Sequence, residues 1–119
     1  PYTEIMFSLK KNDKKYIIYG IAGLVKMEYN ISECYPKLDM VADEFKQLFP
    51  NAKIRKKNDK HAEDKSGKSK VDKTSFKFKS GGFIKIACFD WSEKMNYKDH
   101  FRMGILSAEF DEWLKIAYK

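Results

Sequence analysis

The pattern of hydrophobic and polar positions predicts a β-hairpin at the start of the chain. Two apolar stretches, residues 4–9 and 16–24, flank the polar sequence KKNDKK, in which Asn12-Asp13 is a turn signal. In the first stretch hydrophobic residues occupy every second position from Ile5 to Leu9, which is the period of a half-buried strand. The second is rich in β-branched and aromatic residues, although YIIYGIAGLVKM is also compatible with a buried helix.

The next hydrophobic pattern predicts an amphipathic helix over residues 36–49. Pro36 suits the first turn of a helix, and Pro50 ends it. The apolar positions recur at three- and four-residue spacing, at Leu38, Val41, Phe45 and Leu48. This spacing indicates a helix that covers a sheet with one face.

The second half of the chain predicts further strands and a last helix. SFKFK and FIKIACF are separated by Ser80-Gly81-Gly82, a strong hairpin signal. Residues 101–107 supply another strand, and a short one is expected at residues 53–55. Ser107 is a good N-cap for a final helix, AEFDEWLKIAYK.

These elements predict an α+β fold in a single domain covering residues 1–119. The order β-β-α-β-β-β-β-α is most simply packed as one antiparallel sheet with two α-helices on one face. Between residues 56 and 73 almost every position is polar, so we expect a long basic loop inserted there, with the tip of an extended hairpin as the alternative.

Composition adds limits to this picture. The chain is 43% hydrophobic and 15% aromatic, enough for a core without covalent crosslinks. Cys34 and Cys88 match neither a disulfide framework nor a zinc spacing, so we expect buried free thiols, in keeping with a reducing cytosol. No apolar window is long enough to span a membrane, and acidic Glu4 precedes the short apolar run near the start, so no secretory leader is expected. We therefore expect a cytoplasmic protein with no membrane contact, metal or cofactor.

The positive charge of the chain is localised. The net charge is +7, and residues 53–79 hold eleven Lys or Arg against four Asp or Glu, whereas the rest of the chain is balanced. Such an excess attracts DNA, RNA or an acidic protein. Lysine outnumbers arginine 22 to 2, which favours sequence-independent contacts with a nucleic-acid backbone over base readout, although an AT-rich genome would produce the same bias.

Two catalytic motifs suggest themselves within this segment. Ser66-Gly67-Lys68-Ser69 resembles part of a phosphate-binding loop. However, Ala62 stands where that motif requires a glycine, and the sequence does not predict the strand before it and the helix after it. Asp59 with Glu63-Asp64-Lys65 resembles a metal-dependent nuclease site, but these carboxylates lie in one polar segment without a rigid support. We expect neither an ATPase nor a metal site.

The histidines leave one enzymatic alternative open. His61 or His100, with a lysine or Arg102, supplies the residue types of a small metal-independent ribonuclease. Their spacing does not support such a site, and an exposed loop histidine together with a structural histidine is the preferred interpretation.

The preferred hypothesis is a small non-enzymatic protein that contacts a polyanion, nucleic acid foremost, through the basic loop. The predicted contact residues are Lys56, Lys57, Lys60, Lys65, Lys68 and Lys70. The alternative is a protein-protein interaction module, such as an accessory or inhibitor protein of a phage or mobile element. It would bind an acidic partner or form a homodimer through a sheet edge. A ribonuclease is the third hypothesis.

Overall fold

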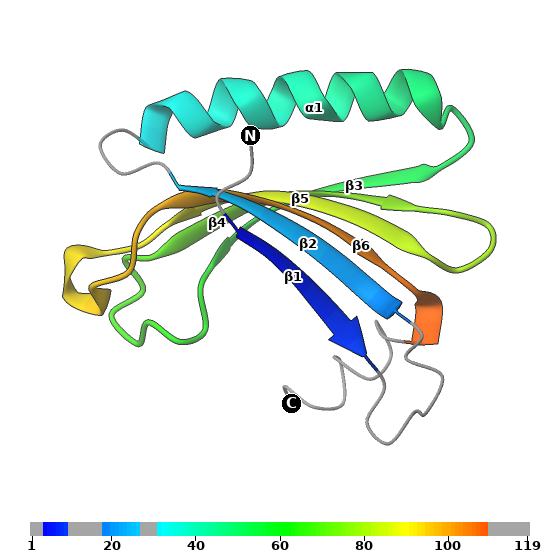
Figure 1. Cartoon of the computed structure of the whole chain (residues 1–119). Helices are drawn as coiled ribbons and strands as arrows, with labels where there is room; N and C mark the ends of the chain where they lie inside the picture. Colours follow the sequence, from blue (N-terminus) through cyan, green and yellow to red (C-terminus); the bar gives the residue numbers. More distant parts are fainter. Residues whose placement is uncertain (1–3, 10–17, 27–30, 110–119) are drawn as a thin grey trace.

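The computed structural model describes residues 4–9, 18–26 and 31–109 of the 119-residue chain (Figure 1). The strands are β1 (Glu4–Leu9), β2 (Ile18–Lys26), β3 (Lys53–Lys60), β4 (Lys70–Lys77), β5 (Phe83–Asp90) and β6 (His100–Leu106). The helices are α1 (Cys34–Leu48) and two 3-10 turns, η1 (Ile31–Glu33) and η2 (Glu93–Met95).

The six strands form one antiparallel sheet in the order β1-β2-β6-β5-β4-β3. Helix α1 lies across one face of this sheet (Figure 1). The prediction of an α+β fold with a single antiparallel sheet is therefore confirmed. The predicted second helix covers residues 108–119. From position 110 onward these lie outside the described residues. None of the helices in the described part is long and apolar enough to cross a membrane.

Helix α1 begins two residues before Pro36, and its buried stripe differs in part from the prediction. Cys34, Leu38 and Ala42 are buried against the sheet, and Phe45 packs beside them. Leu48, expected in the stripe, is 67% exposed. It lies in the last turn of α1, at the margin of the buried stripe.

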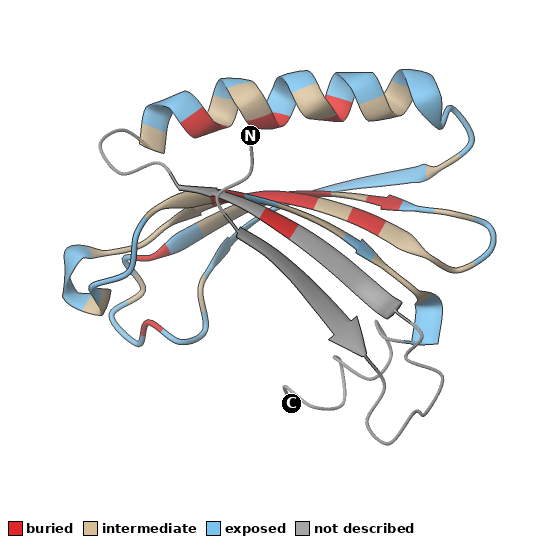
Figure 2. Cartoon of the chain, in the orientation of Figure 1, coloured by how far each residue is buried: buried red, intermediate tan, exposed pale blue. Residues whose placement is uncertain are grey.

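The hydrophobic core lies between α1 and the sheet (Figure 2). Ile84, Ile86 and Cys88 alternate along β5 and point toward the helix, as the strand period predicts. Phe76 of β4 and Phe101 of β6 flank them and are fully buried. The intervening residues of these strands therefore face away from α1.

The expectation of two free thiols is wrong. Cys34 and Cys88 form a disulfide that joins the first turn of α1 to β5, across a sequence separation of 54 residues. Both were correctly expected to be buried, but burial on facing elements brings them together. Disulfides persist in oxidising environments, so the cysteines no longer support a reducing compartment.

The long basic loop predicted for residues 56–73 is also wrong, and the alternative of an extended hairpin is confirmed. Strand β3 continues to Lys60 and pairs residue by residue with β4, which starts at Lys70, so only residues 61–69 form the connection. Every residue of β3 is exposed. An exposed edge strand needs no alternating apolar positions, and for this reason the hydrophobic pattern did not reveal it.

Candidate nucleic-acid interface

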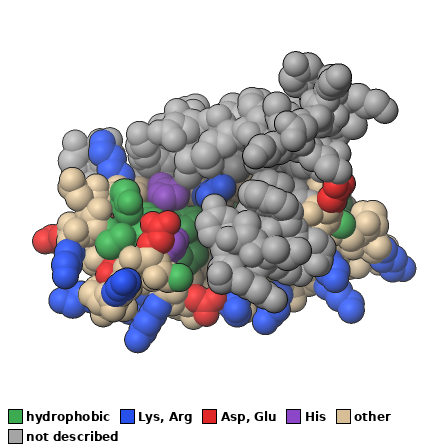
Figure 3. All heavy atoms as spheres, turned by 90° about the horizontal axis from the view of Figure 1, so that it is seen from below, with side chains coloured by type: hydrophobic (Ala, Val, Ile, Leu, Met, Phe, Trp, Pro, Cys, Tyr) green, Lys and Arg blue, Asp and Glu red, His purple; other side chains and the backbone are tan. Residues whose placement is uncertain are grey.

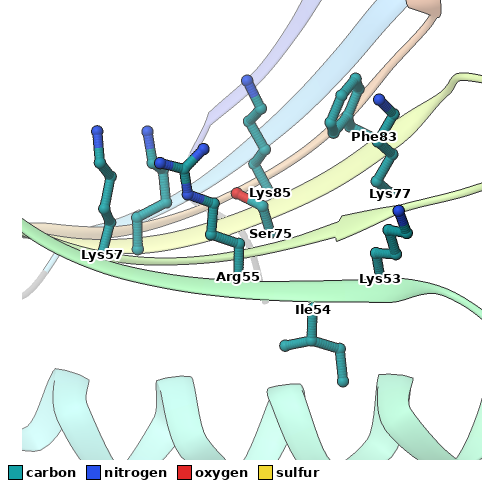
Figure 4. Close-up of a pocket in the computed structure, with 9 residues that line it drawn as sticks. Lys53, Ile54, Arg55, Lys57, Ser75, Lys77, Phe83 and Lys85 are labelled. Carbon is teal, nitrogen blue, oxygen red and sulfur yellow. The ribbon is translucent and has the colours of Figure 1, made fainter.

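The face of strands β3 to β6 that points away from α1 is strongly cationic. Along β3, the residues Lys53, Arg55 and Lys57 point to this side, whereas Ile54 between them points toward the helix (Figure 4). Because side chains alternate between the two sides of a strand, the register places further cations of the neighbouring strands on this same side. We call the whole set the basic face: Lys53, Arg55, Lys57, Lys73, Lys77, Lys85 and Arg102.

Strand register places several of these cations directly opposite each other. Lys53 pairs with Lys77, and Lys57 pairs with Lys73. Like charges at directly opposite positions destabilise a sheet. These pairs therefore place unfavourable like-charge contacts on this face of the sheet.

Lys73 lies at the centre of this arrangement and is half-buried. Burial lowers the pKa of the Lys73 ammonium, and the nearby cations Lys85 and Lys57 lower it further, whereas Asp59 raises it. Asp59 forms an ion pair with Lys57, with 3.5 Å between Oδ2 and Nζ. One carboxylate thus offsets only a small part of the positive charge.

All cations of the basic face except Arg102 border a depression of about 500 Å³ on the sheet surface (Figure 4). At one end of it, Phe83 is covered by two ammonium groups, because the Nζ atoms of Lys77 and Lys85 lie 5.7 and 5.2 Å from its ring centroid. These cation–π contacts hold two long side chains upright on the sheet.

Protection of the sheet edge explains part of this charge. Lysines on an exposed edge strand discourage pairing with another chain, and β3 is such an edge. This reason covers Lys53 and Lys57 but not Lys73 and Lys85, which lie on the inner strands β4 and β5. The homodimer through a sheet edge stays a prediction.

The structure divides the lysines predicted as contact residues. Lys57 belongs to the basic face, but Lys56 points to the other side of β3, where it lines a cavity beside Tyr35 and Asp39 of α1. Lys60 and Lys70 are paired opposite each other at the end of the β3-β4 hairpin. The remaining two, Lys65 and Lys68, are exposed in the connection.

Sequence reasoning missed most of the basic face. Lys53, Arg55, Lys73 and Lys77 lie inside the charged segment but were not selected, and Lys85 and Arg102 lie outside it. The available signal was the alternation in FKFK and FIKI, where lysines occupy the strand positions between core residues.

The connection between β3 and β4 is organised around one buried carboxylate. Asp64 Oδ1 accepts hydrogen bonds from the Ser66 backbone N–H and hydroxyl, at 3.0 and 2.6 Å. Asp64 Oδ2 accepts from the Ser69 N–H and hydroxyl, at 3.1 and 2.6 Å, and from the Ser92 hydroxyl at 2.7 Å. These bonds, those from Ser66 foremost, hold the pKa of the Asp64 carboxyl well below its ordinary value.

This arrangement also explains the sequence Ser66-Gly67-Lys68-Ser69. Its serines bind the carboxylate of the same connection, and a strand follows, so it is not a phosphate-binding loop. Gly67 has a positive φ of 74°, which favours glycine in the turn. Asp64 is likewise a structural residue, and no group of residues in the described ranges has the composition of a metal site.

Replacing Asp64 with asparagine is expected to lower the Tm by roughly 5 °C at pH 7, because an amide cannot accept all five hydrogen bonds. A lowered folded-state pKa contributes stability that is complete above the ordinary value of 3.8 and is lost as the pH falls below it. Thermal unfolding followed by circular dichroism from pH 7 to 2.5 should therefore show a flatter acid limb for the variant. Glu63→Gln, an exposed neighbour, is the control. Parallel pH profiles of wild type and Asp64→Asn would contradict an ionised Asp64.

Next to the basic face lies a group of five rings, which we call the aromatic cluster: His61, Phe89, Trp91, Tyr97 and His100. The ring of His100 stacks on Phe89 at 4.5 Å with an interplanar angle of 13°, and His61 lies 4.4 Å from Trp91. Tyr97 meets Trp91 edge to face at 4.8 Å. Viewed from the side opposite α1, histidine and hydrophobic side chains lie together at one end, with lysines around them (Figure 3).

The two histidines thus share Phe89 as a neighbour, which their spacing did not predict. Each uses one ring nitrogen in a local contact: His61 Nδ1 accepts from the Glu63 N–H at 3.2 Å, and His100 Nδ1 donates to the Lys98 carbonyl at 3.1 Å. Ribonuclease activity stays a prediction.

Comparison with protein-family models, with curated proteins and with solved structures finds no match to this chain. A function is therefore inferred from the basic face and its surroundings.

Proposed function

We propose that this protein binds nucleic acid through phosphate contacts made by the basic face. The observation that supports this is the continuation of lysines from the edge strand β3 onto the inner strands β4 and β5, with directly opposed lysine pairs between β3 and β4. A row of phosphates is the kind of ligand that removes this repulsion, because it brings one negative charge for each cation. Binding then releases counterions from the nucleic acid.

The side chains on the basic face also define the kind of recognition. Five of its seven cations are lysines, which act as mobile point charges, whereas a bidentate fork for a base edge requires arginine. Binding should therefore show little sequence preference and a strong dependence on salt. We infer a binding protein that tracks a backbone rather than one that reads a sequence.

Two triple variants with equal net charge test this proposal. Arg55→Gln, Lys73→Gln and Lys85→Gln remove three cations from the basic face. The matched control, Lys56→Gln, Lys65→Gln and Lys68→Gln, removes three from other surfaces. Fluorescence anisotropy with a labelled oligonucleotide should show at least tenfold weaker binding for the first variant at 50 mM salt, and little change for the control.

The salt dependence gives a second readout. For a single-stranded oligonucleotide, a plot of the logarithm of the association constant against the logarithm of the salt concentration should be less steep by about two units in the basic-face variant. The reason is the loss of three phosphate contacts. Equal losses in both variants would assign binding to total charge rather than to the basic face. No binding by wild type at low salt would overturn the proposal. Binding to polyglutamate but not to oligonucleotides would instead indicate an acidic protein partner.

A further inference from the structure

The aromatic cluster continues the surface of the basic face. Phe89 lies two positions after Ala87 on β5, and the register aligns Ala87 with Lys73 on one side and Arg102 on the other. Successive positions on one face of a strand are about 7 Å apart. The ring of Phe89 therefore follows directly after a row of cations on the same side of the sheet.

These rings do not belong to the hydrophobic core. The core lies between α1 and the sheet, and none of the five residues of the aromatic cluster is part of it. Phe89, Trp91 and both histidines are half-buried, and Tyr97 is 55% exposed. Their packing leaves ring surface at the protein exterior, where core formation does not explain it.

The backbone holds the cluster in place from two sides. The Trp91 N–H donates to Asp99 Oδ1 at 2.7 Å. Ser92, the next residue, donates from its N–H to the Ser69 hydroxyl at 2.9 Å and from its hydroxyl to Asp64. The buried carboxylate thus fixes both the connection that carries His61 and the segment that carries Trp91. A surface whose rings are held before binding loses less entropy when it binds.

We propose that the ligand of the basic face is single-stranded nucleic acid whose bases stack on the aromatic cluster. This inference rests on the proposed function and names its substrate class. In a duplex the bases already stack on each other, so only a single strand can present a base to a protein ring. Phosphates lie along the cationic rows, and the first base beyond them reaches the rings of Tyr97 and Trp91. Stacking accepts every base, which agrees with the expected lack of sequence preference.

The test compares three labelled ligands: a 15-nucleotide thymidine strand, an abasic strand of the same length and a 15-base-pair duplex. The abasic strand keeps the phosphates but has no bases to stack. Wild type should bind the thymidine strand at least fivefold more tightly than either of the others, since one stacked base has about this effect.

Two variants assign the effect to the rings. Tyr97→Ala should reduce the affinity for the thymidine strand about fivefold and leave the abasic strand unchanged, whereas Tyr97→Phe keeps the ring and should retain affinity. Because Tyr97 is largely exposed, its replacement should not impair folding. Trp91→Ala, compared with Trp91→Phe, repeats the test at the neighbouring ring.

The outcomes distinguish this inference from the proposed function on which it rests. Equal affinity of wild type for the thymidine and abasic strands would overturn base stacking and leave phosphate binding in place. Tighter binding of the duplex would overturn the single-strand assignment. Failure to bind any of the three ligands at low salt would overturn the proposed function itself.

Discussion

Removing the disulfide by the double substitution Cys34→Ala and Cys88→Ala is expected to lower the free energy of unfolding by about 4 kcal/mol. The estimate comes from the chain entropy that a crosslink removes from the unfolded state, for residues separated by 54 positions. Both cysteines are almost completely inaccessible, at 0% and 1% exposure, so the bond lies inside the contact between α1 and β5. A loss of this size is a large part of the stability of a small domain.

Urea unfolding with and without a reducing agent measures this effect. The reductant should shift the wild-type midpoint to a lower urea concentration and leave the double variant unchanged. Comparison of oxidised with reduced wild type isolates the crosslink, because no side-chain volume is lost. An unchanged wild-type midpoint after complete reduction of the disulfide would contradict the prediction.

Reversing one charge at the centre of the basic face should change binding and stability in opposite directions. Lys73→Glu is expected to weaken oligonucleotide binding on the order of 100-fold at 50 mM salt, because it removes one phosphate contact and adds a repulsive charge. The same change replaces the Lys57–Lys73 repulsion with an attraction across the strands. A pair of opposite charges at these facing positions should raise the free energy of unfolding by about 0.5 kcal/mol.

Lys56→Glu is the matched control for this experiment. Lys56 adjoins Lys57 on β3 but points to the helix side and pairs with Thr74. The Lys56→Glu variant should therefore not gain stability, and it should lose less affinity for the oligonucleotide than Lys73→Glu does. Urea midpoints and anisotropy titrations on the same protein samples give both quantities. A Lys73→Glu variant that is less stable than wild type would show that the lysine pairs are not strained by repulsion. A variant that binds normally would remove Lys73 from the interface.

Local patterns in the sequence predicted most of the architecture. The Ser80-Gly81-Gly82 turn lies between β4 and β5, as expected, and the face formed by Ile84, Ile86 and Cys88 is the buried one. These predictions succeeded because turn chemistry and side-chain alternation act over a few residues. The extent of β3 escaped prediction because its stability comes from pairing with β4, and it has no buried side chain to mark it.

The sequence predicted the positive charge of the candidate site but not which lysines lie together on one face of the sheet. The charge excess of residues 53–79 pointed to a polyanion, and Lys57 lies on the basic face. Lys56 shows why the predicted lysines do not share one face, since adjacent residues in a strand point to opposite sides of a sheet. The predicted basic loop directed attention to Lys65 and Lys68, whereas the inner-strand lysines are brought together only by register.

The sequence alone determined the secondary structure of the core elements, the net charge and the chemistry available to a ligand, since these depend on residue type and on near neighbours. Only the tertiary structure decided which lysines share a face, that Cys34 meets Cys88, and that the serines around Gly67 bind Asp64. Each of these depends on strand register and on the packing of α1 against the sheet. Contacts between residues far apart in the chain leave no local pattern from which they can be recognised.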